Sequence, residues 1–117
     1  MTVWMTQIIQ KIGRKFMSNY RPTEAMANNA VRGLKMRDES TPSNKGGTQV
    51  GLARANQFAK RESVSLETVM RTYQFLSRAR VYYKPGENTK GTQAYLMWGG
   101  PAGLTWASKI LRDEGVI

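Results

Sequence analysis

Residues 48–81 read TQVGLARANQFAKRESVSLETVMRTYQFLSRARV and contain the clearest pattern in the chain. Apolar side chains recur at helical spacing in the second half, which is typical of a helix with one side in a core. They are Leu66, Val69, Met70, Tyr73 and Leu76. Thr48 and Ser65 are suited to cap two consecutive helices, and Val50, Ala53 and Phe58 give the first helix its apolar side. We expect two amphipathic helices with a break at residues 62–64.

Arginine and glutamine side chains line the other side of both predicted helices. The first helix carries Arg54, Gln57 and Arg61 at i, i+3 and i+7, and the second carries Arg71, Gln74 and Arg78 at the same spacing. Guanidinium groups bind phosphate and the edge of guanine, and amides pair with adenine. Lys45, Lys60 and Arg80 lie nearby in the sequence. The pattern predicts one cationic patch that binds nucleic acid.

The same two helices have the outline of a helix-turn-helix, in which the second helix would enter the major groove. Any two consecutive amphipathic helices share this outline. The alternative is therefore a helical bundle whose arginines are only solvated, and both interpretations stay open.

Helical patterns extend over most of the remaining chain. Residues 3–17 form an amphipathic pattern, and a second helix is expected from Pro22 to about Glu39. Its predicted buried side is Met26, Ala27, Ala30, Val31 and Leu34. Residues 40–47, STPSNKGG, predict a loop. A final helix is expected to bury Leu104, Ala107, Ile110 and Leu111.

Residues 82–91, YYKPGENTKG, predict a turn or a short hairpin near 80–92, with a short strand around 80–83 as one form of it. Together these patterns predict an all-α fold, a compact bundle of five or six short helices with a central helix-turn-helix-like pair. Residues 1–20 would form an N-terminal amphipathic helix on or beside the domain, and residues 21–117 the basic helical domain.

Charge and composition narrow the function. The 117 residues carry 18 Lys and Arg against 8 Asp and Glu, a formal charge of +10, with no His and no Cys. Such a surplus favours polyanions, so nucleic acid is the first partner to consider and an anionic membrane the second. The absent residue types exclude zinc fingers, thiol nucleophiles, disulfides and imidazole bases. No apolar run is long enough to span a bilayer, and no secretory signal is evident, so we expect a soluble intracellular protein.

Smaller motifs allow two interpretations each. Gly46, Gly47 and Thr48 before a helix could hold an anion, or simply form a loop and a cap. Tyr82 and Tyr83 could stack on unpaired bases, although core packing is expected for one of them. Trp98 and Trp106 are expected in the core. Trp4 would contact the domain, a partner protein or a membrane interface.

Three blocks of the sequence resemble a small module of tailed-phage genomes, found freestanding or attached to head-morphogenesis proteins such as prohead proteases. They are residues 46–55 (GGTQVGLARA), residues 65–71 (SLETVMR) with Phe75 and Arg78, and residues 94–100 (AYLMWGG) with Gly103, Trp106 and Ala107. The resemblance covers roughly residues 26–112. It implies a phage or prophage origin and a helper associated with DNA or the capsid.

The chain departs from that module at two places. Where the module often has Arg-His-Glu-Val, this sequence has Arg78, Ala79, Arg80 and Val81. Where an acidic residue often follows the paired glycines, it has Pro101. Both changes remove acidic groups and the first also removes an imidazole, so catalysis at these positions is not expected and binding to polyanions is favoured.

We therefore predict a phage-encoded nucleic-acid-binding protein, not an enzyme, without cofactor or metal, that binds duplex DNA mainly through phosphates. No membrane partner is expected. The protein would act in the host cytoplasm during infection or as part of the virion. The alternative is a phage effector or virion component whose basic face and N-terminal helix bind an acidic host or phage protein.

Overall fold

The computed structural model describes residues 18–117, which form five α-helices, two short strands and two 3-10 turns. The helices are α2 (Glu24–Asp38), α3 (Gln49–Ala59), α4 (Leu66–Ala79), α5 (Lys90–Met97) and α6 (Gly100–Asp113). The strands are β1 (Ser18–Tyr20) and β2 (Val64–Ser65), and the 3-10 turns are η1 (Pro42–Asn44) and η2 (Arg80–Tyr82). The predicted all-α class is confirmed. The helix expected at residues 3–17 lies outside the described residues.

Hydroxyl side chains cap four of these helices, α2 to α5. Thr48 Oγ1 accepts a hydrogen bond of 3.1 Å from the Gly51 amide, and Ser65 Oγ accepts one of 3.3 Å from the Thr68 amide. Both predicted caps are therefore confirmed. The start predicted for α2 at Pro22 is wrong, because Thr23 caps this helix and its first residue is Glu24.

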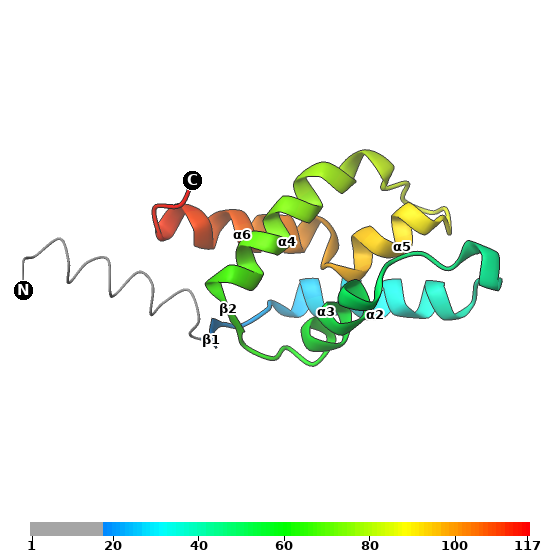
Figure 1. Cartoon of the computed structure of the whole chain (residues 1–117), viewed down its shortest axis with the longest axis horizontal. Helices are drawn as coiled ribbons and strands as arrows, with labels where there is room; N and C mark the ends of the chain where they lie inside the picture. The colour runs from blue at the N-terminus through cyan, green and yellow to red at the C-terminus, as the bar shows by residue number, and fades with distance from the viewer. Residues whose placement is uncertain (1–17) are drawn as a thin grey trace, which may run out of the picture.

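The helices form two groups around one aromatic core (Figure 1). Helix α4 packs on α6, and α2 packs on α3, α5 and α6. The Phe58 ring meets Trp98 and Trp106 edge-on, with ring centroids 6.5 and 6.1 Å away. Phe75 stacks on Trp98 at 5.0 Å. The expectation that both tryptophans lie in the core is confirmed.

Two of the predicted apolar stripes are partly wrong. Val31 is 51% exposed and Val50 is 55% exposed, and Ala53 is also exposed. Small residues lie at buried positions of α2 and α3 instead, because these helices approach their neighbours closely. The buried side of α2 is Met26, Ala27, Ala30 and Gly33, and that of α3 is Gly51, Ala55 and Phe58.

The two strands form a small antiparallel sheet that the sequence did not predict. Ser18 pairs with Ser65 and Tyr20 with Val64. The Tyr20 hydroxyl also donates a 2.9 Å hydrogen bond to Glu114 Oε1, at the end of α6. The start of the described chain is thus held against both α4 and α6.

The short strand expected around residues 80–83 is wrong. These residues form η2 and its cap, in which the Tyr83 amide donates to the Arg80 carbonyl at 3.2 Å. The turn continues directly from α4 and satisfies its backbone groups locally. It also directs Tyr83 inward, where its ring stacks on Tyr95 at 4.8 Å.

Candidate nucleic-acid interface

The row of polar residues predicted on α3 is only partly formed. Arg54 Nη1 donates a 2.9 Å hydrogen bond to Gln57 Oε1, and both side chains are half-buried. Arg61 lies beyond the end of α3, with a φ of 54°, and its Nε donates to the Pro22 carbonyl at 2.9 Å. The expectation that Arg61 continues the face of Arg54 is therefore wrong, because the helix ends first and Arg61 is used to hold the segment before α2.

The two lysines predicted at the edges have different environments. Lys45 Nζ donates to the Arg37 carbonyl at 2.8 Å and to the Asp38 carbonyl at 3.3 Å. This ammonium group satisfies carbonyls at the C-terminal end of α2, where the helix dipole favours positive charge. Lys60 is exposed at the C-cap of α3.

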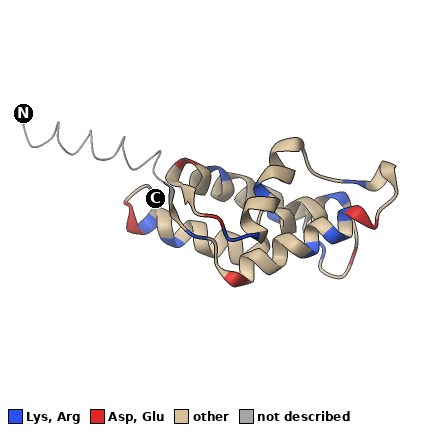
Figure 2. Ribbon diagram, turned by 90° about the horizontal axis from the view of Figure 1, so that it is seen from below, with Lys and Arg blue, Asp and Glu red and all other residues tan. Residues whose placement is uncertain are grey.

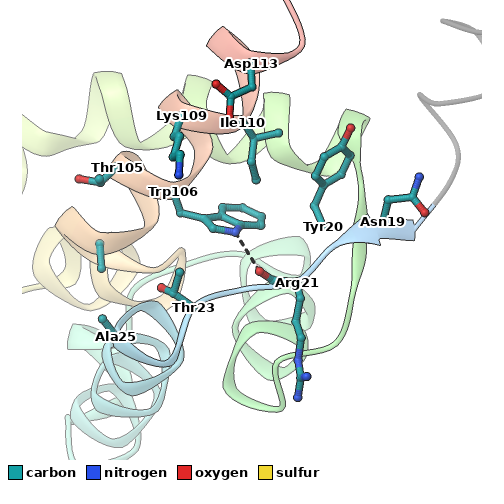
Figure 3. Close-up of a pocket in the computed structure, with 11 residues that line it drawn as sticks. Asn19, Tyr20, Arg21, Thr23, Ala25, Thr105, Trp106, Lys109, Ile110 and Asp113 are labelled. Carbon is teal, nitrogen blue, oxygen red and sulfur yellow. Dashed lines mark hydrogen bonds between the residues drawn. The ribbon is translucent and has the colours of Figure 1, made fainter.

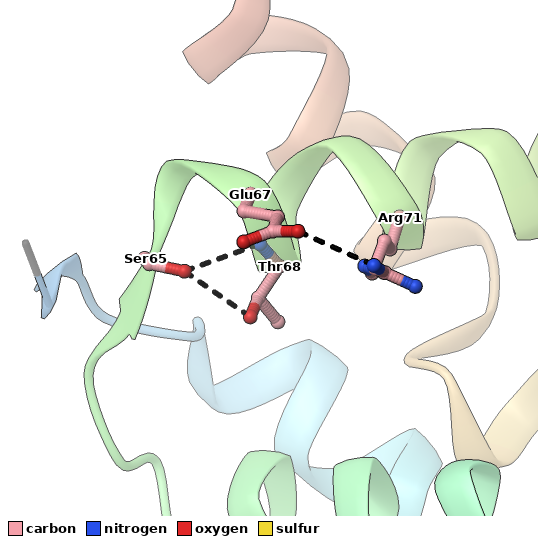
Figure 4. Close-up of polar contacts among 4 residues, drawn as sticks. All are labelled: Ser65, Glu67, Thr68 and Arg71. Carbon is pink, nitrogen blue, oxygen red and sulfur yellow. Dashed lines mark hydrogen bonds and ion pairs between the residues drawn. The ribbon is translucent and has the colours of Figure 1, made fainter. Parts of the chain in front are cut away.

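The row predicted on α4 is formed. Arg71, Gln74 and Arg78 are all exposed on this helix. Arg71 Nη2 lies 3.2 Å from Glu67 Oε1, one turn earlier and next to the Ser65 cap (Figure 4). Arg78 Nε donates to the Gln74 carbonyl at 3.2 Å. An exposed pair such as Arg71–Glu67 contributes at most ~1 kcal/mol, so an anionic ligand can compete with the carboxylate.

Exposed cations continue past the end of α4. Arg80 lies in η2, Lys84 follows it, and Lys90 is the first residue of α5; all three are exposed. We name the exposed cations of this region the basic edge: Arg71, Arg78, Arg80, Lys84 and Lys90. Among the described residues, only Arg71 of the basic edge has a carboxylate within 4.0 Å. The prediction had not included Lys84 and Lys90 because neither belongs to the helical repeat, although Lys84 follows the two tyrosines directly.

Tyr82 projects from the middle of the basic edge. This residue is 65% exposed, whereas Tyr83 is packed on Tyr95. The expectation that one of the two tyrosines packs in the core is confirmed. Burial raises the pKa of Tyr95, the neighbouring Tyr83 raises it further, and Arg80 partly opposes this increase.

Tyr82 lines two shallow hollows. One, of about 360 Å³, is lined by Tyr82, Asn44, Lys84, Thr89, Lys90 and Gly91. The other, of about 340 Å³, is lined by Tyr82, Phe75, Arg78, Ala79, Gly91 and Ala94. The first is bordered by two ammonium groups, and the second combines an aromatic floor with a guanidinium group.

The predicted single patch across α3 and α4 is interrupted on α3, where Arg54 is hydrogen-bonded to Gln57 and Arg61 to the Pro22 carbonyl. Helix α3 packs on α2 and α5, whereas α4 packs on α6, so each row belongs to a different group of helices. The two helices follow one another as in a helix-turn-helix, but each packs mainly on other helices. Figure 2 shows basic residues on several helices and connections, with acidic residues between them. The exposed cations of the basic edge follow one another along α4, η2 and the start of α5.

The glycine-rich segment before α3 forms a loop and a cap. The Gly46 amide donates a 2.7 Å hydrogen bond to Gln93 Oε1, and both residues are buried. Since this amide is already engaged, Gly46 contributes no donor to an anion site.

A hollow of about 640 Å³ lies between α6 and the connection from β1 to α2 (Figure 3). Trp106 lines it, and its indole donates a 2.9 Å hydrogen bond to the Arg21 carbonyl. Lys109 and Asp113 also border this hollow. It contains none of the residues predicted to bind nucleic acid.

Two further observations concern the described part of the chain alone. Within residues 18–117, no three acidic side chains are grouped as metal ligands would be. Over the same residues, the helices are too short or too polar to cross a bilayer.

Comparison of the chain with protein-family models, with curated proteins and with solved structures found no match.

Proposed function

We propose that this protein binds nucleic acid through the basic edge, holding duplex DNA mainly by its phosphates. The observation that carries the proposal is a run of exposed cations with little opposing charge. No acidic residue occurs from residue 68 to residue 86, and Glu87 is the only one between Glu67 and the start of α5.

The geometry of α4 supports contact with a backbone. Arg71 and Arg78 are two turns apart on one exposed side of a regular helix, and Gln74 lies between them. Guanidinium groups can donate two hydrogen bonds to one phosphate, and they stay charged at every physiological pH. A helix with such a row can follow a strand of phosphates without reading its bases.

The half-buried cations take a structural role in the proposal. Lys45 and Arg61 donate to backbone carbonyls, and Arg54 donates to Gln57. Moving them to a ligand would break these hydrogen bonds, each worth about 1 kcal/mol, with a larger cost for charged donors. The contact surface proposed here is therefore narrower than the pattern of the sequence implied.

The phage setting is also part of the proposal. It is supported by the resemblance of the three sequence blocks to the tailed-phage module, and it would place the protein in the host cytoplasm during infection or in the virion. An acidic protein partner is the competing explanation for the same exposed cations.

The proposal is tested by titrating the full chain into a labelled blunt duplex at several salt concentrations. We expect log affinity to fall linearly with log salt, with a slope of roughly −0.9 for each phosphate contacted. Polyglutamate of the same charge serves as the comparison. Binding to polyglutamate that equals or exceeds binding to the duplex would overturn the proposal in favour of an acidic protein.

A further inference from the structure

We infer that Tyr82 forms a stacking site for one unpaired nucleobase, so that the protein prefers nucleic acid with unpaired nucleotides beside the phosphates that it contacts. This inference rests on the proposed function and concerns the same surface. The blunt duplex described above contains no such nucleotide, which allows the two to be tested separately.

The backbone and Cβ of Tyr82 are held in place by close packing, whereas the residue is largely exposed to solvent. Gly91, in the first turn of α5, lies against it so closely that a Cβ on Gly91 would be 2.7 Å from Tyr82 Cβ and 2.9 Å from its carbonyl oxygen. Only glycine permits this approach. The backbone of Tyr82 is thus held against α5, while the residue as a whole is 65% exposed.

The hollows beside the ring give a planar ligand space to stack. On one side, Phe75, Ala79 and Ala94 provide an apolar floor. An exposed aromatic ring next to such a floor is suited to the face of a base, which every nucleotide offers regardless of sequence.

The charges around the ring fit the backbone of the same nucleotide. Arg78 borders the apolar hollow, and Lys84 and Lys90 border the other one. A strand whose base stacks on Tyr82 therefore has a cation in each of the two hollows for its flanking phosphates. This combination of a stacking ring and a basic groove is how proteins hold single strands without sequence preference.

The neighbouring residue Val81 serves to separate the effect of a stacking ring from the effect of exposed apolar surface in general. Val81, the preceding residue, is 71% exposed but lines neither hollow. It offers a control of matched position, because its truncation removes apolar surface without removing a stacking partner.

The test uses three labelled ligands that share one duplex: a blunt form, a form with a short thymidine overhang, and a form with an abasic overhang of equal phosphate number. We expect the wild type to bind the thymidine overhang roughly 5-fold to 150-fold more tightly than the abasic one, the range typical of one stacked base. Y82A should abolish this difference and Y82F should keep it. V81A should behave as the wild type.

The salt dependence separates stacking from charge. Y82A should leave the slope of log affinity against log salt unchanged, whereas K84Q together with K90Q should reduce it, by roughly 0.7 for each single-strand phosphate that is no longer neutralised. Equal affinity of the wild type for the thymidine and abasic overhangs would overturn the stacking site. In that case salt-dependent binding to the blunt duplex would still support the proposed function. Failure to bind the blunt duplex would contradict both the proposed function and the stacking site.

Discussion

Gln93 Oε1 accepts a hydrogen bond of 2.7 Å from the backbone amide of Gly46, 47 residues earlier in the chain. The amide nitrogen of the same buried side chain lies within 3.0 Å of Ser40 Oγ, the Asn44 carbonyl and Asn88 Oδ1. One glutamine of α5 therefore joins the loop after α2 to the turn before α5. Because Asn44 also lines the hollow beside Tyr82, this network supports the candidate site.

Replacing Gln93 with Ala should lower the free energy of unfolding by about 1–3 kcal/mol, because the substitution leaves buried polar groups without partners. Urea denaturation measures the change. Gln74 is exposed on α4, so Q74A is the matched control and should change stability by no more than ~0.5 kcal/mol. Equal effects of the two substitutions would show that the network adds little stability.

Gly99, between α5 and α6, should tolerate alanine poorly. Its φ is 108°, and a Cβ there would lie 3.0 Å from Gly103 Cα. Gly86 has a similar φ of 86° but no atom within 4 Å of a Cβ. We expect G86A to cost about 1 kcal/mol from backbone strain, and G99A clearly more because a backbone contact must also shift. Thermal and urea unfolding of both variants would measure the difference, and a smaller cost for G99A would contradict this packing.

Removing the carboxylate of Glu67 should strengthen binding to duplex DNA. E67Q frees Arg71 from its ion pair and raises the net charge beside the basic edge, while costing no more than about 1 kcal/mol of stability. E24Q makes the same charge change in the first turn of α2 and serves as the control. Affinity that rises equally in both variants would indicate a general effect of net charge.

Tyr95 should make the free energy of unfolding depend on pH in the alkaline range. Its folded pKa lies above the ordinary value of 10.0, mainly because of burial, so the neutral hydroxyl is favoured in the folded state. The resulting stability is present below pH 10 and is lost as pH rises through the folded pKa. Between roughly pH 9 and pH 11, the free energy of unfolding of the wild type should therefore fall further than that of Y95F. Parallel curves would count against this role.

The sequence predicted the elements that local rules govern. Thr48 and Ser65 were identified as caps because a hydroxyl before an apolar repeat has one common use, and α4 was clear because its stripe is regular. The exposed row on α4 was predicted by the same spacing. These features depend on neighbours within a few residues.

Features that depend on distant parts of the chain were missed. Strands β1 and β2 are three and two residues long, too short for a periodic pattern, and they pair across more than 40 residues. Val31 and Val50 were expected to be buried because valine is apolar, but α2 and α3 approach their neighbours through small residues. Arg61 was assigned to the face of Arg54 because nothing local showed that α3 ends at Ala59.

A localised interface is tested most directly by comparing two triple variants that remove equal charge. The first variant changes Arg71, Arg78 and Arg80 of the basic edge to Gln. The second changes Arg32, Lys109 and Arg112 to Gln; these three residues are exposed on α2 and α6. Binding to a blunt duplex is measured across salt concentrations. For the first variant, we expect the magnitude of the slope of log affinity against log salt to decrease by roughly 0.9 for each phosphate that it no longer contacts. The second variant should keep a slope close to that of the wild type. An equal fall in both variants would contradict a localised interface.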